Sequence, residues 1–290
     1  MFCKFCGNQI KDNAKFCINC GTSQDTFSSK ATIFKNKHFL IVTGITLFII
    51  ICATVYLSQK KSDTPTKEQR DHDIASSVVN IYCTGKKDED ASGGSGTILT
   101  EDGLVMTNAH IIPEGDSKDI GCIVILPDPT NGSPDEMYTA YPIIVPKLSE
   151  KYDLAFVQID DVYYDHEENK AYGEYPKKFA AYDSAKYCKD QDVKLGEPVR
   201  IYGYPSISGG YALTITDGIV SSLLPDEGYI ITSAKISHGN SGGLAVDENG
   251  CQIGIPAMVS SDDSESLGVI ISNNLIEEFT SEVHTYLDNN

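Results

Sequence analysis

The sequence predicts an all-β domain, a sandwich or a barrel, over most of its 290 residues. From residue 74 onward, short apolar runs rich in Val, Ile, Thr and Tyr recur between Gly, Pro and Asp residues, as β-strands do. No helical periodicity separates these runs, which argues against alternating strands and helices. Only the end of the chain departs from this pattern. There, after Asn273 and Asn274 as caps, apolar residues at helical spacing predict an amphipathic helix: Leu275, Ile276, Phe279, Val283 and Leu287.

Charge divides the chain into a basic head and an acidic body. Residues 1–37 hold six Lys and two acidic residues, whereas residues 62–290 hold 15 Lys and Arg and 39 Asp and Glu, a net charge of −24. An acidic domain stays soluble and repels nucleic acid and anionic membrane surfaces. The composition therefore argues against nucleic-acid binding by the large domain.

Two CxxC motifs open the chain. Each places a Gly directly after its second Cys, and ten residues separate the motifs. Four thiolates in two such turns suit tetrahedral Zn²⁺, and the Gly allows the positive φ that turns backbone amides toward the sulfurs. Disulfides and a redox motif are the alternatives, but a redox CxxC has no need of two matched copies. We expect a zinc ribbon over residues 1–25, with structural Zn²⁺ bound by Cys3, Cys6, Cys17 and Cys20.

This head resembles the zinc ribbons that open many prokaryotic membrane proteins. The resemblance implies a module that stabilises the chain or binds a cytoplasmic protein partner. Lys4, Lys11 and Lys15 give it a weakly basic face, so a nucleic-acid role for the ribbon is the lesser alternative.

An uncharged run of 19 residues, 39–57, follows a linker of residues 26–38. This length spans a bilayer as a helix. The alternatives are a buried core helix, which is rarely apolar all round, and the core of a signal peptide, which is shorter and nearer to Met1. Because no small-residue cleavage site follows, we expect a retained transmembrane helix and a single-pass membrane protein.

Flanking charge does not decide the orientation, since three basic residues precede the apolar run and four follow it. Thiolate ligands need a reducing compartment, so we expect the N-terminus in the cytoplasm and the large domain outside. We expect residues 58–73 to form a solvated tether and residues 74–290 to form the large domain. Inside it, the polar, Tyr-rich residues 160–190 predict a long surface loop or insertion.

A serine in a Gly-rich run is the first candidate for catalysis. A serine hydroxyl is a weak nucleophile unless a base takes its proton, and the resulting oxyanion needs fixed donors. In the run GNSGG, glycines around Ser241 let the chain turn so that the amides of Gly239 and Ser241 can face one oxygen. A plain Gly-Ser turn is the alternative, as the run SGGSG at residues 92–96 illustrates.

A histidine and an aspartate are the candidate partners of this serine. His110 follows an apolar strand and therefore lies at the strand's exit rather than in its interior. Asp153 directly precedes the apolar run LAFV, where a carboxylate is held rigidly. A strand-end cap is the alternative role for Asp153, and Asp119 and Asp128 are weaker competitors because no such strand follows them.

The order His, Asp, Ser and the surrounding motifs resemble the HtrA/Deg branch of the trypsin-like serine proteases. The resemblance covers residues 74–280 and rests on GSGTIL with TNAHII, YDLA, GYP, TITDGIVSSL and GNSGGLAVDENGCQIGI. It implies two six-stranded β-barrels with the site between them, and an endopeptidase that cleaves extracytoplasmic polypeptides. It assigns Ser241 as nucleophile, His110 as general base, Asp153 as the group that orients it, and the amides of Gly239 and Ser241 as the oxyanion hole.

Several features depart from the family pattern. Leu244 replaces the usual Pro, and His238 lies beside the oxyanion turn. About 20 residues follow Val269, so we expect no PDZ domain. The family also implies small aliphatic P1 residues and, in many members, a homo-oligomer, which no residue of this sequence establishes.

Two further questions stay open at the level of sequence. The isolated cysteines either form two disulfides, in one of three pairings, or remain buried thiols: Cys83, Cys122, Cys188 and Cys251. The rival function is a protease fold that serves only as a binding or sensing scaffold. The presence of all three triad residues argues against it.

Overall fold

The computed structural model describes residues 1–23, 65–86, 91–187, 193–259 and 267–289. The chain divides into two units, Met1–Thr64 and Pro65–Asn290. The predicted linker (residues 26–38) and transmembrane helix (residues 39–57) lie outside the described residues. None of the described helices combines the length and apolar character needed to cross a membrane.

The N-terminal unit contains two CxxC turns, each closed by one antiparallel bridge. Gly7 and Gly21 both have φ of 72°, the left-handed conformation predicted for the Gly after each motif. Cys3, Cys17 and Ile10 are buried and form a minimal core. So small a core cannot stabilise a fold of this size by itself, and a metal held by the four cysteines would supply the missing folding free energy.

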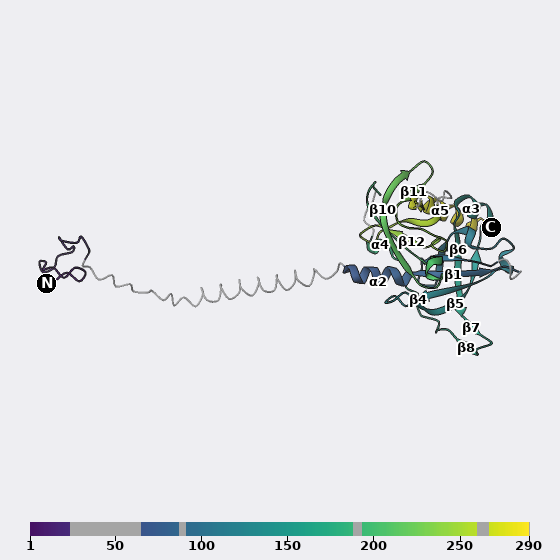
Figure 1. Cartoon of the computed structure of the whole chain (residues 1–290), viewed down its shortest axis with the longest axis horizontal. Coiled ribbons are helices and arrows are strands. Elements are labelled where there is room, and N and C mark those ends of the chain that lie inside the picture. The colour runs from purple at the N-terminus through teal and green to yellow at the C-terminus, as the bar shows by residue number, and fades with distance from the viewer. Residues whose placement is uncertain (24–64, 87–90, 188–192, 260–266, 290) are drawn as a thin grey trace. The chain divides into compact units, whose positions relative to one another are not determined.

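The larger unit forms two closed six-stranded barrels, which confirms the predicted all-β class and the double barrel (Figure 1). The strand orders are β1-β2-β3-β6-β5-β4 and β10-β11-β14-β13-β12-β9. The first barrel comprises β1 (Val78–Thr84), β2 (Ala91–Ile98), β3 (Leu104–Thr107), β4 (Gly121–Pro127), β5 (Pro134–Ile143) and β6 (Ala155–Val162). The second comprises β9 (Pro198–Gly203), β10 (Thr214–Leu224), β11 (Tyr229–Thr232), β12 (Leu244–Val246), β13 (Gln252–Val259) and β14 (Gly268–Ser272).

Short helical turns connect these strands, and each barrel has its own apolar core. Side chains such as Ile81 and Val157 fill the first barrel, and Ile201 and Ile253 fill the second. The short 3₁₀ turns are η1 (Ala109–Ile111), η2 (Ser117–Asp119) and η3 (Ser206–Ser208).

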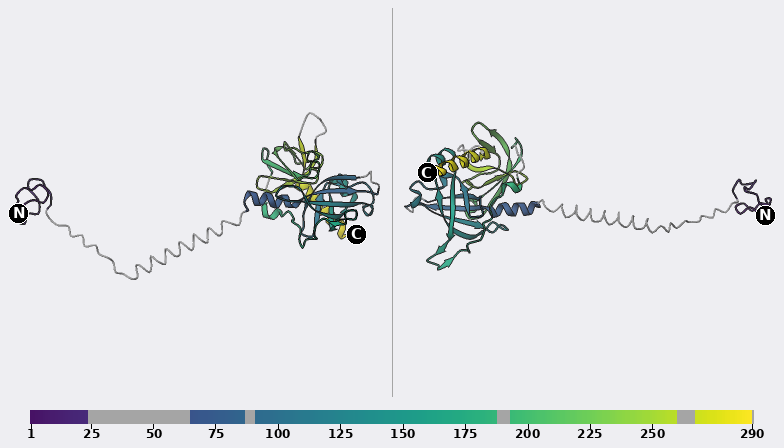
Figure 2. Two further views of the ribbon diagram at one scale, coloured as in Figure 1. Left: turned by 60° about the horizontal axis from the view of Figure 1, so that its bottom comes forward. Right: turned by 180° about the vertical axis from the view of Figure 1, so that it is seen from behind.

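Helix α5 (Asn273–Asp288) is the predicted C-terminal helix, and it packs against residues of both barrels and against α3 (Pro146–Tyr152) (Figure 2). The Phe279 ring stacks on Phe156 at 5.4 Å and meets Tyr152 edge-on at 5.8 Å. Two details of the prediction are wrong. Ser272, extended as the chain leaves β14, is the N-cap instead of the two asparagines, and Leu287 is 55% exposed, so the buried face stops before it.

Helix α2 (Lys67–Ser77) corrects the prediction that residues 58–73 form only a tether. Ile74 is fully buried, and Asp71 forms an ion pair with Arg200 of β9 at 2.7 Å. The larger unit therefore begins before the predicted boundary. The sequence does not reveal this helix, because a helix is recognised by a wide apolar face and this one has none. Contacts with the second barrel stabilise it instead.

The polar residues 160–190 contain more regular structure than the predicted loop. Strand β6 extends to Val162, a hairpin of β7 (Tyr164–Asp165) and β8 (Lys170–Ala171) follows, and α4 (Ser184–Tyr187) is a single turn. Phe179 and Tyr182 are buried, and the Tyr182 hydroxyl donates to the Gly250 carbonyl at 2.9 Å. Two isolated buried aromatics create no periodic pattern, which is why the sequence does not reveal them.

One disulfide pairs neighbouring strands of the first barrel. Cys83 of β1 is bonded to Cys122 of β4, which selects one of the pairings left open by the sequence. Cys251 is also disulfide-bonded, and Cys188 lies outside the described residues.

Candidate active site

Two loops of the first barrel bring His110 and Asp153 together. The Asp153 Oδ2 atom lies 2.8 Å from His110 Nδ1, and Oδ1 accepts a hydrogen bond from the His110 amide at 3.1 Å. The Asp153 carbonyl accepts from Asn108 Nδ2 at 2.8 Å and from the Ala109 amide at 3.2 Å. These contacts orient the imidazole through Nδ1 and leave Nε2 for another partner.

The loops of His110 and Asp153 lie at the same end of the barrel because the strands next to them, β3 and β6, are paired. Thr107, the last residue of β3, pairs with Ala155, the first residue of β6. Asp153 lies just before β6 as the C-cap of α3, with φ 52° and ψ 42°. This left-handed conformation is unfavourable for a residue with a Cβ, so the surrounding contacts must hold it. Residues 43 positions apart thereby become neighbours.

The competing aspartates lie in other surroundings. Asp119 forms an exposed ion pair with Lys86 at 3.2 Å, and Asp128 accepts a hydrogen bond from the Thr130 amide within its own turn. Within the described residues, neither contacts His110.

The Gly-rich run forms a tight turn against the same loops. Gly239 and Gly242 have φ of 97° and 82°. A Cβ on Gly242 would lie 2.3 Å from Thr107 Oγ1, and a Cβ on Gly239 would lie 2.2 Å from a backbone oxygen. Both positions therefore require glycine. The close approach to Thr107 brings the segment of Ser241 next to the segment of His110.

The two peptide groups that flank Gly239 are each held by one hydrogen bond. The His238 carbonyl accepts from the Ser206 amide at 2.8 Å, and the Gly239 carbonyl accepts from the Ser95 hydroxyl at 2.6 Å. A trans peptide points its N–H opposite to its C=O, so the Gly239 N–H faces away from Ser206. Neither this amide nor that of Ser241 donates a hydrogen bond to any described residue. Fixed, unpaired amides of this kind can stabilise an oxyanion.

The Ser241 hydroxyl makes no hydrogen bond to His110. It donates instead to the Ala257 carbonyl at 3.1 Å, and the described residues include no hydrogen bond between Ser241 and His110. Catalytic hydrogen bonds are often misaligned without substrate. For His110 to accept its proton, the hydroxyl would have to rotate away from Ala257.

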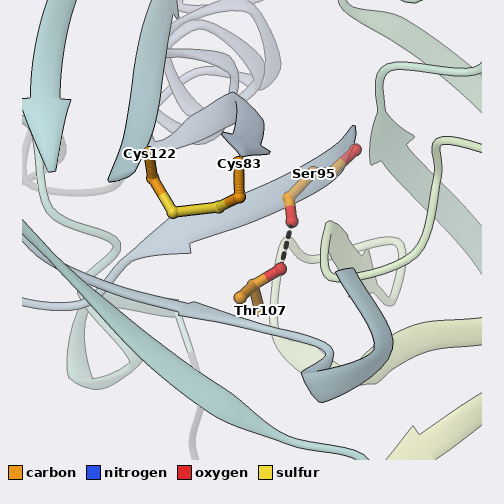
Figure 3. The surroundings of a disulfide bond; sticks show 4 residues. All are labelled: Cys83, Ser95, Thr107 and Cys122. Carbon is orange, nitrogen blue, oxygen red and sulfur yellow. Dashed lines mark hydrogen bonds between the residues drawn. A yellow bond between two sulfur atoms is a disulfide. The ribbon is translucent and has the colours of Figure 1, made fainter. Parts of the chain in front are cut away.

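Ser95 is the residue at this site that the sequence analysis missed. Its side chain is fully buried, its amide donates to the Ser241 carbonyl at 2.8 Å, and its hydroxyl accepts from the Tyr204 amide at 2.9 Å. Its carbonyl accepts from the Thr107 hydroxyl at 2.7 Å, beside the disulfide of the first barrel (Figure 3). Ser95 therefore joins the first barrel to the turn of residues 239–243 in the second, which we call the oxyanion turn. Its segment appears in the sequence as a plain Gly-Ser string and as part of the family-like motif GSGTIL, but neither pattern gives Ser95 a role.

The four ribbon cysteines fit a tetrahedral metal. Their sulfurs lie within 4.8 Å of one another, with 3.7 Å between Cys3 and Cys20 and 3.6 Å between Cys6 and Cys17. Zinc–sulfur bonds of about 2.3 Å in a tetrahedron place the sulfurs about 3.8 Å apart. A hydrogen bond from the Thr22 hydroxyl lowers the pKa of the Cys20 thiol to about 6, which favours the thiolate needed for coordination. A bound zinc ion would hold the two turns together.

Comparison with known proteins agrees with both units. Residues 94–255 match the trypsin-like peptidase domain, and residues 2–24 match the zinc-ribbon domain. The chain is 26% identical over 287 residues to serine protease HTRA1 of Xenopus laevis, which covers 91% of this chain and 54% of that protein. It is 31% identical over 182 residues to the probable periplasmic serine endoprotease DegP-like of Brucella suis biovar 1 (strain 1330), covering 61% of this chain and 29% of that protein.

A solved structure shares the fold. The crystal structure of the serine endoprotease from Yersinia pestis aligns with a TM-score of 0.55 and 23% identity, covering 75% of this chain and 66% of that one. The chain spans about half the length of HTRA1 and less of the DegP-like relative. The peptidase match extends over more than half of the 290 residues and includes His110, Asp153 and Ser241. The chain therefore belongs to the trypsin-like peptidase family.

Proposed function

We propose that this chain is a serine endopeptidase that hydrolyses peptide bonds with His110, Asp153 and Ser241. The observation that carries the proposal is the His110–Asp153 contact at 2.8 Å beside a Gly-rich turn with two unpaired amides. The names of the HTRA1 and DegP-like relatives, both serine proteases, support it. Polypeptides are the substrate class.

In the proposed reaction, Ser241 Oγ attacks the scissile carbonyl carbon as His110 Nε2 takes the hydroxyl proton. Asp153 accepts from Nδ1–H, which selects the tautomer and stabilises the imidazolium. The amides of Gly239 and Ser241 donate hydrogen bonds to the oxyanion, and each stabilises the transition state by about 3 kcal/mol. His110 then protonates the leaving amine, and a water that it deprotonates hydrolyses the acyl-enzyme.

We further propose that residues 39–57 anchor the chain in a membrane, with the ribbon in the cytoplasm and the peptidase unit outside. Cysteine chemistry supports this arrangement. The bonded pair Cys83 and Cys122 suits an oxidising compartment, whereas the ribbon cysteines are not disulfide-bonded and suit a reducing one.

Protease added to intact cells tests the orientation. It should remove an epitope at the C-terminus and spare one at the N-terminus. Protection of the C-terminal epitope in intact cells, with its loss after lysis, would contradict the proposed arrangement.

A fluorophosphonate probe tests the catalytic proposal directly. It should label the wild type, and Ser241→Ala should abolish labelling. Asp153→Asn should slow labelling by about 10⁴-fold, because the imidazole then takes the wrong tautomer. Asp119→Asn is the matched control, because this carboxylate lies on the surface beside Lys86, and it should label like the wild type. A wild type that resists the probe under every activating condition would sink the proposal.

A peptide-binding scaffold without proteolysis is a second candidate, favoured by one observation. The Ser241 hydroxyl donates to Ala257 and not to His110. A scaffold of this kind should bind peptides while remaining unlabelled, and Ser241→Ala should leave its affinity unchanged. Covalent labelling of Ser241 would exclude it.

A further inference from the structure

A groove of about 590 Å³ adjoins the oxyanion turn and has no role in the reaction described above. His238 and Gly239 form part of its wall. Other lining residues come from the first barrel, including Tyr82 of β1, Ile123 of β4 and Met137 of β5. The groove is therefore continuous with the proposed oxyanion hole.

The residues described in the lining of this groove are uncharged and largely apolar. None of the described residues that line it is Asp, Glu, Lys or Arg, although the unit carries a large excess of acidic residues. Tyr82 and Tyr211 are 45% and 64% exposed, and within the described residues their hydroxyls make no hydrogen bond. A charged side chain entering this groove would lose hydration without gaining an ionic partner among the described lining residues. Apolar and aromatic side chains avoid that cost, and tyrosine hydroxyls can bond to a peptide backbone beside them.

The sheet next to Ser241 indicates which half of a substrate faces this groove. Beyond Gly254, β13 pairs with β14 on one edge, and no described strand pairs with its other edge. The Ala257 carbonyl on β13 accepts the Ser241 hydroxyl, so this open edge adjoins the nucleophile. An added substrate strand is most stable when antiparallel. Such a strand enters near Val259 and ends at Ser241, which places its acyl half on β13.

The leaving half of the substrate then continues past Gly239 on the other side of Ser241. There it meets the groove, which is lined by β2 residues such as Gly93 as well as by Tyr82 and Tyr211. Gly93 is exposed and has no side chain, so an extended peptide can approach the backbone of β2 closely. Each extended residue spans about 3.3 Å, so the first three residues after the scissile bond reach about 10 Å into the groove.

We propose that this groove binds the leaving-group side of polypeptide substrates and selects apolar or aromatic side chains within three residues after the scissile bond. The proposal rests on the proposed endopeptidase function. It adds a specificity site that is independent of the pocket for the residue before the scissile bond.

The groove can be tested by itself by measuring how well different added amines compete with water for one and the same acyl-enzyme. The acyl half is then constant, and only the leaving-group side varies. p-Nitrophenyl acetate acylates Ser241 and releases nitrophenol. An added amino-acid amide then attacks the acyl carbon through its nitrogen, an amide bond forms as the bond to Ser241 Oγ breaks, and the proton passes through His110 to Oγ. Phenylalaninamide and leucinamide should capture the acyl group at least about tenfold more efficiently than aspartamide or lysinamide.

Variants of the groove should remove this preference. Tyr82→Ala combined with Tyr211→Ala should reduce the ratio of phenylalaninamide to aspartamide capture several-fold. Tyr141→Ala is the matched control, because Tyr141 is 48% exposed on β5 but does not line the groove, and it should keep the wild-type ratio. Because the readout is a ratio within one protein, partial loss of folded protein does not imitate the effect.

The outcomes separate this proposal from the endopeptidase proposal. Rapid acylation with equal capture of all four amides would overturn the groove assignment and leave the endopeptidase intact. A preference for charged amides, or a wild-type ratio in the double variant, would also overturn the assignment. Failure of the wild type to form any acyl-enzyme or to react with the fluorophosphonate would overturn both.

Discussion

At the scale of single residues, Ser95 shows how one side chain holds an oxyanion turn. Its hydroxyl donates to the Gly239 carbonyl at 2.6 Å and accepts from the Tyr204 amide at 2.9 Å. Removing the hydroxyl leaves two buried backbone groups unpaired, which costs about 1–3 kcal/mol for each. Because Gly239 carries a proposed oxyanion donor, part of this cost should be expressed in the transition state. Ser95 is thus a positioning residue.

We predict that Ser95→Ala lowers kcat by about 10- to 100-fold with little change in KM, because the displaced donor contacts only the transition state. Affinity for a peptide boronate should fall in parallel with kcat. Ser77→Ala is the control, because Ser77 is equally buried and its hydroxyl donates to Ile74 at 2.8 Å, away from the turn. Equal losses of kcat in the two variants would contradict the positioning role and show that Ser95 contributes only to the stability of the fold.

At the scale of elements, α5 supports the loop that carries Asp153. Phe279 contacts Phe156 of β6 and Tyr152, the last residue of α3. The Tyr152 hydroxyl also donates to Glu282 of α5 at 2.8 Å. The C-terminal helix therefore braces both elements that flank Asp153.

Phe279→Ala should lower the free energy of unfolding by about 3–5 kcal/mol, because it empties a buried aromatic site. Urea denaturation followed by circular dichroism measures the change. Leu287→Ala lies on the same helix at a 55% exposed position and should stay within about 0.5 kcal/mol of the wild type. Similar losses in both variants would contradict the assigned packing.

The docking of α2 predicts a pH dependence of stability. Burial alone raises the pKa of Asp71, but the hydrogen bond and charge of Arg200 outweigh it and lower this pKa. A carboxyl whose folded pKa is lowered stabilises the fold above its unfolded pKa of about 3.9, and this stabilisation is lost as the pH falls through the folded pKa.

Asp71→Asn should therefore cost roughly 1–3 kcal/mol at pH 7, and the difference from the wild type should shrink below about pH 4. Chemical denaturation at several pH values measures this difference. Asp119→Asn removes an exposed ion pair and should cost less than about 1 kcal/mol at pH 7. A cost for Asp71→Asn that is independent of pH would rule out the ionic contribution.

At the scale of the whole molecule, the ribbon and the peptidase unit are separate compact units. We predict one zinc ion per chain, measured by elemental analysis. Cys20→Ser should reduce zinc occupancy, while Asn19→Ser, an exposed change in the same motif, should not. Chelation should leave fluorophosphonate labelling unchanged, because the proposed catalytic residues all lie in the other unit. Labelling that is lost on chelation and restored by zinc would contradict this independence.

Much of this molecule follows from short-range patterns in its sequence. The spacing of the cysteines predicted that the four would form one cluster, and their sulfurs lie within 4.8 Å of one another. Short apolar runs rich in Val, Ile, Thr and Tyr, bounded by Gly, Pro and Asp, predicted the strands, because such side chains fit a half-buried pleated surface and such residues form the turns between strands. The TNAH and GNSGG motifs marked strand exits and tight turns, and the structure brings His110 to Asp153 and packs the turn of Ser241 beside them.

The tertiary structure alone decided the features that depend on distant partners. Helix α2 exists through contacts such as Asp71 with Arg200, and the pairing of Cys83 with Cys122 follows from the register of β1 and β4. The role of Ser95 and the uncharged groove likewise appear only when both barrels are assembled. A local pattern records which backbone conformation a segment prefers. It does not record which residues, more than a hundred positions away, complete its hydrogen bonds.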